Sequence, residues 1–265
     1  MKASQKLVAA VLAAGLLASC DGVRRERLNV TVERKWPAAE IERVRVSEAN
    51  GSVNVEASSS DEITLVAHVH GRGERPDANQ DNQGYFTSRV SGDTLRIGRQ
   101  SKGRRSFVMF GRGGGMTVDY TLKVPADVAL DLQTVNGRII TRGVDGETEA
   151  TTVNGNIDIE TSGTSELSAS AVNGRVRAKF LRSFQGAHFK TVNGAVDATL
   201  PSDASFAVNL SQVNGDFEAS FPLNIRSNPG SRRVSGEVNG GRHELRIVTV
   251  NGHVELSQLT PASVK

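Results

Sequence analysis

Cysteine is nearly absent from this sequence, since Cys20 is the single one in 265 residues. A lone cysteine excludes an internal disulfide framework and a metal site with several cysteine ligands. Aromatic residues are also scarce, at 5% of the chain. Any hydrophobic core must therefore consist mainly of valine, isoleucine, leucine and alanine.

Residue patterns typical of catalysis and metal binding are missing as well. The five histidines are scattered and form no HxxxH pair or histidine–carboxylate cluster of the kind that binds zinc. The serines include no Gly-x-Ser-x-Gly nucleophile elbow. We therefore expect no metal ion, no cofactor and no enzymatic activity.

The N-terminal residues have the pattern of an export signal. Lys2 and Lys6 precede Leu7–Leu17, an unbroken run of apolar residues and glycine that is short for a transmembrane helix. The stretch Leu17-Ala18-Ser19-Cys20 that follows resembles the bacterial lipobox, in which cleavage precedes a cysteine that becomes lipidated; the alternative is an ordinary signal peptide with an incidental cysteine. We expect residues 1–19 to be a lipoprotein signal peptide and residues 20–27 to be a lipidated cysteine with a short linker.

A lipidated Cys20 makes the membrane the first expected partner, because several acyl chains give stable attachment. Asp21 resembles the signal that retains a lipoprotein at the periplasmic face of the inner membrane in enterobacteria-like hosts. Removal of residues 1–19, which hold two lysines and no acid, lowers the net charge from +3 to +1. An exported chain with so small a charge is not expected to bind nucleic acid.

The most prominent pattern in the chain is a repeated Asn-Gly pair. Eight such pairs occur, and the steps between the second and the sixth are 18, 19, 20 and 21 residues. A nearly constant period of about 20 residues indicates stacked structural repeats. The expected corners are Asn136, Gly137, Asn154, Gly155, Asn173, Gly174, Asn193, Gly194, Asn214, Gly215, Asn251 and Gly252.

Apolar residues alternate with polar ones on both sides of each corner, which predicts a β-strand before and after it. The apolar phase shifts by one residue near the corner; we place the shift at the Thr-Val step, so that Val192, Gly194 and Val196 face inward. Two folds fit this pattern. One is a sheet of antiparallel hairpins with type I′ turns. The other, which the constant period favours, is an all-β solenoid of roughly 20-residue coils, whose stacked asparagines would form a side-chain amide ladder.

A single domain over residues 28–260 accounts for the rest of the chain. Strand-like alternation recurs at Ile63–Val69, Thr94–Ile97 and Thr117–Val124. Three irregular insertions are expected, at residues 71–84, 103–115 and 224–241. The last contains Asn239-Gly240, which departs from the repeat pattern and is expected to form an ordinary turn.

Repeated "TVNG" corners after a "VPADVALDLQTVNG" segment, behind a lipobox, resemble a bacterial putative-adhesin family of uncharacterised β-strand-repeat lipoproteins. The resemblance implies a role in the cell envelope and binding of an envelope protein or glycan. Some relatives are linked with envelope stress. It implies no catalytic residues.

Two sets of outward-facing charges are candidate sites on the repeats. Asp158, Arg177 and Asp197 should form an alternating row on neighbouring strands, roughly 5 Å apart. Asp197, Asp216 and Glu218 should form an acidic cluster without an intervening base. Such carboxylates are either a solvated strand face or the acid and base of a glycan lyase or hydrolase.

A basic segment with an apolar centre, Arg96–Met116, lies between Asp93 and Asp119 and contains no acid. It is either a mobile hairpin whose centre folds onto the stack or a binding segment for anionic lipid or an acidic glycan. The candidate binding residues are Lys102, Arg104, Arg105, Phe107, Phe110 and Arg112.

These patterns together favour a non-enzymatic, lipid-anchored scaffold or adhesin-like binding protein of the cell envelope. The alternatives are a β-helix glycan lyase or hydrolase and an accessory protein of envelope-stress sensing.

Overall fold

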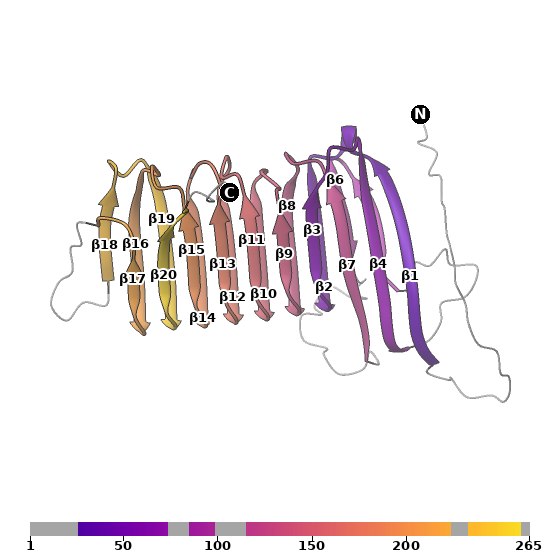
Figure 1. Ribbon diagram of the computed structural model, residues 1–265. Coiled ribbons are helices and arrows are strands. Elements are labelled where there is room, and N and C mark those ends of the chain that lie inside the picture. Colours follow the sequence, from indigo (N-terminus) through magenta and orange to yellow (C-terminus); the bar gives the residue numbers. More distant parts are fainter. Residues whose placement is uncertain (1–25, 74–84, 99–114, 224–232, 261–265) are drawn as a thin grey trace, which may run out of the picture.

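The computed structural model describes residues 26–73, 85–98, 115–223 and 233–260, which form two mixed β-sheets of ten strands each (Figure 1). Sheet A consists, in spatial order, of β1 (Glu26–Pro37), β4 (Glu62–Gly73), β7 (Met116–Val124), β3 (Val53–Ala57), β9 (Ile139–Arg142), β11 (Ile157–Thr161), β13 (Val176–Phe180), β15 (Val196–Leu200), β20 (Val254–Gln258) and β17 (Phe217–Ala219). Sheet B consists of β18 (Arg233–Val238), β16 (Phe206–Asn214), β19 (His243–Asn251), β14 (Ala187–Asn193), β12 (Leu167–Asn173), β10 (Thr148–Asn154), β8 (Ala129–Asn136), β2 (Arg43–Asn50), β6 (Thr94–Gly98) and β5 (Thr87–Ser91).

Each repeat contributes one strand to each sheet, and the Asn-Gly corner joins the two strands. The strands before and after a corner, such as β10 and β11, lie in opposite sheets and pair with strands of neighbouring repeats. This pairing is parallel and in register, so that Asn154 lies opposite both Asn136 and Asn173. The corners are therefore not hairpin turns, and the repeats form a solenoid-like stack.

Helix is nearly absent from the described residues, whose one helical segment is the three-residue 3-10 turn η1 (Ala38–Glu40). The expectation of an all-β fold is confirmed. In the same residues, no helix has the length and apolar character needed to cross a membrane.

The order of the strands in space departs from their order in the chain. The last repeat, β19 and β20, lies between the β14–β15 repeat and the β16–β17 repeat. At the other end, β6 and β7 stack outside β2 and β3. Antiparallel strands complete the sheets at both ends, with β1 and β4 beside β7, β5 beside β6 and β18 beside β16.

The space between the sheets is filled by one continuous hydrophobic core. Small aliphatic side chains, such as Ala150, Val176 and Ala178, occupy the middle repeats. Several large rings gather toward the ends of the stack. At one end Phe86 packs edge-on against Tyr120, and at the other Phe184 packs edge-on against Phe206. These rings close the core where a further repeat is missing.

The structure corrects the expected position of the phase shift. The residue before each corner valine is buried, whether it is a threonine, as at Thr152 and Thr191, or another residue, as at Ala171, whereas the valine faces outward. Val172, Val213 and Val250 are 38%, 44% and 37% exposed. The shift thus occurs at the Asn-Gly corner itself rather than at the Thr-Val step.

Two of the expected insertions are partly strand. β4 continues to Gly73, beyond the expected start at residue 71. Within 224–241, residues 233–238 form β18, which pairs antiparallel with β16 and covers the edge of sheet B. The expected turn at Asn239-Gly240 is present, with positive φ at both residues.

Candidate functional site

The repeated asparagines form a continuous side-chain row along the stack, here called the amide ladder. The Nδ2 of each asparagine donates to the Oδ1 of its neighbour at 2.8–3.0 Å. The expected ladder is confirmed, but its end follows the spatial order of the strands. The members, in order, are Asn50, Asn136, Asn154, Asn173, Asn193, Asn251 and Asn214.

The buried threonines and the glycines of the corners are explained by the same packing. Thr152 Oγ1 donates to the Gly137 carbonyl of the preceding repeat at 3.2 Å, and Thr134 Oγ1 donates to Gly51 at 3.0 Å. A Cβ on Gly174 would lie 1.8 Å from the Gly155 carbonyl oxygen, so only glycine fits. The repeated threonine, asparagine and glycine of the corner are occupied by contacts between repeats, which makes the corner a structural element.

The charged row on the outer face of sheet A is present as expected. Arg177 lies between Asp158 and Asp197, with nitrogen–oxygen distances of 3.2 and 3.5 Å. Arg138 and Arg175 approach the same two carboxylates at 3.8 and 3.5 Å. The arginines are half-exposed, so the row contributes little to stability.

The acidic cluster expected from Asp197, Asp216 and Glu218 does not form as such. Because β20 lies between β15 and β17, Glu255 stands opposite both Asp197 and Glu218. Asp197 and Glu218 are thus two strand spacings apart, roughly 10 Å. Asp216 lies in the corner before β17, outside this row. Among the described residues, no group of three or more His, Cys, Asp or Glu is arranged to hold a metal ion.

The other expected site residues lie outside the described part of the chain. These are Cys20 and the six candidate residues of the basic segment, Lys102, Arg104, Arg105, Phe107, Phe110 and Arg112.

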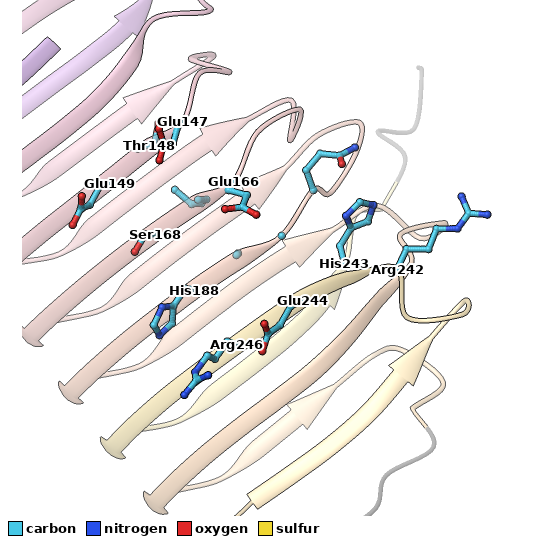
Figure 2. A pocket seen from close by; sticks show the side chains of 14 residues that line it. Glu147, Thr148, Glu149, Glu166, Ser168, His188, Arg242, His243, Glu244 and Arg246 are labelled. Atoms are coloured by element: carbon cyan, nitrogen blue, oxygen red, sulfur yellow. The ribbon is translucent and has the colours of Figure 1, made fainter. Parts of the chain in front are cut away.

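A groove of about 700 Å³ lies on the outer face of sheet B, where β10, β12, β14 and β19 begin. We call it the Gly186 groove. Figure 2 shows Glu166 and Glu244 toward the beginning of these strands, and His188 and Arg246 further along them. Its charged and imidazole-bearing lining residues include Glu149, Glu166, His188, Arg242, Glu244 and Arg246.

The hollow exists because Gly186 presents no side chain between two glutamates. Glu166 directly precedes β12, Gly186 directly precedes β14, and Glu244 is the second residue of β19. The strand pairing places these three residues side by side. The φ of Gly186 is +121°, a conformation that residues with a Cβ rarely adopt. A side chain at this position is therefore disfavoured, and the hollow stays open.

Some charges of the groove are paired and others are not. Glu147 at its margin is held by Arg43 at 2.9 Å, and Glu244 accepts a hydrogen bond from Asn209 at 3.2 Å. Glu149 and Glu166 have no side-chain partner among the residues that the structure describes. The groove thus offers exposed acceptors and, from Arg246, exposed donors within one surface.

Sequence reasoning missed this groove for two reasons. Arg242 and Glu244 follow the expected insertion 224–241 and do not continue the apolar alternation of the repeats, and β14 and β19 are neighbours only because the last repeat inserts out of chain order. A signal was nevertheless present. Gly186 precedes a strand at the place where the two repeats before it have Glu147 and Glu166.

The fold defines a class of protein, a two-sheet stack of parallel repeats closed at its ends by antiparallel strands. Residues 130–257 match the family model described as Toastrack DUF4097. These residues are thus similar to Toastrack DUF4097 domains, in agreement with the expected resemblance to a putative-adhesin family of uncharacterised proteins. No protein among curated sequences matches the chain significantly.

Several solved structures are distantly similar to the chain. A putative cell adhesion protein from Clostridium sporogenes shares 7% identity over 88% of this chain and 100% of its own, with a TM-score of 0.44. A putative lipid binding protein from Parabacteroides distasonis shares 11% identity over 87% and 97%, with a TM-score of 0.40. A putative adhesin from Bacteroides fragilis shares 9% identity over 85% and 96%, with a TM-score of 0.36. At these values no partner or ligand transfers to this chain.

Proposed function

We propose that this protein is a non-enzymatic, lipid-anchored binding protein of the bacterial cell envelope, built as a β-solenoid that displays its outer sheet faces to a partner. The observation that carries the proposal is that the recurrent and the variable residues of each repeat have different roles. The residues that recur, such as Thr152, Asn154 and Gly155, are occupied by contacts between repeats. Apart from the recurrent corner valine, the outward strand residues differ from repeat to repeat, which is the variation that a specific binding surface requires.

The anchor in this proposal is Cys20, with Asp21 favouring the periplasmic face of the inner membrane in an enterobacteria-like host. Growth with labelled palmitate tests it directly. The wild-type chain is expected to incorporate label and to sediment with membranes, and Cys20→Ala is expected to lose both properties. Ser19→Ala is the matched control, because a small residue before the cysteine preserves the cleavage pattern. An unlabelled wild-type chain would contradict the anchor.

The basic segment is proposed as a second membrane contact, on its sequence alone. Replacing Lys102, Arg104, Arg105 and Arg112 by alanine removes four positive charges around Phe107. Each basic residue near an anionic surface contributes about 1 kcal/mol, so binding to phosphatidylserine vesicles should fall by orders of magnitude. Unchanged vesicle binding would remove the segment from the proposal.

The absence of enzymatic activity is also open to test. Purified envelope polysaccharides incubated with the protein are expected to release no oligosaccharide by mass spectrometry. Release that disappears in Asp197→Asn would support a glycan lyase or hydrolase instead.

A further inference from the structure

The Gly186 groove is comparable in volume to known ligand sites. Its volume of about 700 Å³ lies within the range of roughly 300–1,000 Å³ that is usual for ligand pockets. It spans four parallel strands, which is about 14 Å from the first strand to the fourth. The groove is therefore long and open along the stack, a shape suited to a short linear molecule lying across the strands.

The floor of the groove is formed at Gly186, which stands where the other three strands of the groove have Glu147, Glu166 and Glu244. A Cβ built on Gly186 would lie 3.5 Å from the Glu244 carbonyl oxygen and 3.8 Å from Glu166 Cγ. It would thus occupy the hollow between the two glutamates without clashing with the backbone. Space alone would admit a side chain, whereas the φ of +121° disfavours one. The groove is consequently a fixed feature of the backbone.

The charges around the groove exclude several kinds of ligand. Four glutamates, Glu147, Glu149, Glu166 and Glu244, stand against two arginines, so a polyanion would be repelled. A compact polycation would meet Arg242 and Arg246 at one side. An apolar ligand would have to remove water from exposed carboxylates without replacing their hydrogen bonds.

Hydroxyl groups fit this lining better than any charged group. Glu149 and Glu166 offer only acceptors at neutral pH, whereas Arg246 offers only donors and Ser168 offers both. A hydroxyl both donates and accepts, so a row of hydroxyls can satisfy both kinds of partner along the groove. His188 and His243 add two flat rings to the lining, and His243 is supported by an edge-on contact with Phe184.

We infer that the Gly186 groove binds an uncharged oligosaccharide across β10, β12, β14 and β19. The inference rests on the proposed function as a binding protein and names its ligand class. Glu149 and Glu166 accept hydrogen bonds from sugar hydroxyls, and Arg246 donates to sugar oxygens. No bond is formed or broken.

The test uses the full-length chain in detergent with cellotetraose, maltotetraose and chitotetraose as probes, and saturation-transfer NMR and calorimetry as readouts. At least one tetrasaccharide is expected to bind. Ser168→Trp places a large ring in the groove and should weaken binding at least about tenfold, whereas Ser170→Trp, further along β12 and outside the lining, is the matched control. Glu166→Gln should weaken binding by roughly tenfold, because a neutral amide oxygen accepts a weaker hydrogen bond than a carboxylate does. Thermal unfolding of each variant checks that the fold is kept.

Three results would overturn the inference. The first is no binding of any tetrasaccharide, and the second is equal binding by Ser168→Trp and wild type. The third is binding of spermidine alone, which would assign the groove to cations. Palmitate labelling separates failure of the lipid anchor from failure of the oligosaccharide site. A labelled, membrane-bound chain that binds no sugar would support the proposed anchor and contradict the proposed ligand.

Discussion

Removing one asparagine from the middle of the amide ladder should cost more than removing one from its end. Asn173 makes two ladder bonds, since its Nδ2 donates to Asn154 Oδ1 at 2.9 Å and its Oδ1 accepts from Asn193 Nδ2 at 3.0 Å. Asn214, the last member, makes one, to Asn251 at 2.8 Å. The corner backbone does not depend on the side chain, because the Asn173 carbonyl still accepts from the Gly155 amide at 3.1 Å.

The magnitude follows from counting bonds. A typical intramolecular hydrogen bond contributes about 0.5–1.5 kcal/mol net, so Asn173→Ala should lower the free energy of unfolding by about 1–3 kcal/mol and Asn214→Ala by about half as much. Mutual polarisation along a hydrogen-bonded chain would increase the difference. Asn209→Ala is the control, because Asn209 is exposed on the same sheet face and makes its one bond to Glu244, outside the ladder.

Urea unfolding followed by circular dichroism measures the three variants against wild type. The midpoint should fall most for Asn173→Ala at an unchanged m-value, which shows that stability rather than the extent of unfolding has changed. Equal losses for Asn173→Ala and Asn214→Ala would refute the reasoning, because the ladder would then add nothing beyond isolated pairs.

Three further predictions follow from the corners and the outer charges. Gly174→Ala should cost more than about 4 kcal/mol or prevent folding, because its Cβ would lie 1.8 Å from the Gly155 carbonyl oxygen. Gly240→Ala, with nothing within 4 Å and a φ of +89°, should cost only about 1–3 kcal/mol by the same unfolding assay. Arg177→Ala should cost about 0.2–1 kcal/mol in low salt and less in 1 M NaCl, since the side chain is half-exposed; a salt-independent loss would contradict an electrostatic role. On long incubation, Asn239 should deamidate faster than Asn173, because the Gly174 amide donates to the Asn193 carbonyl while the Gly240 amide donates to no carbonyl among the described residues; peptide mass spectrometry showing the reverse order would count against this.

The sequence predicted the repeat well because period and alternation are local properties. The strands at Ile63–Val69, Thr94–Ile97 and Thr117–Val124 all lie within observed strands, β4, β6 and β7. The amide ladder also follows from a period alone, since parallel stacking in register brings equivalent side chains together.

The inward face at the corner could not be predicted from apolar character. Valine is more apolar than threonine, so the pattern favoured Val153 for the core over Thr152. The hydrogen bond from Thr152 to the Gly137 carbonyl satisfies the buried hydroxyl and reverses that choice. The sequence of a single repeat does not indicate that a carbonyl of the neighbouring repeat accepts this hydrogen bond.

The spatial order of the repeats could not be predicted from the sequence either. Every repeat presents the same parallel edge, so the β14–β15 repeat can accept either the next repeat in the chain or the last one. The structure places β19 and β20 there, which separates Asp197 from Glu218 and builds the Gly186 groove.

The amide ladder gives the stack an electrical direction. All six of its hydrogen bonds point the same way, with each Nδ2 donating toward the repeat of Asn50. Aligned amide dipoles add, as the peptide dipoles of a helix do. Among the described residues, the row ends in an unused N–H donor at Asn50 and an unused carbonyl acceptor at Asn214. A repeat engineered onto the Asn214 end would have to offer a donor and one added beyond Asn50 an acceptor, so the stack can be extended in only one polarity.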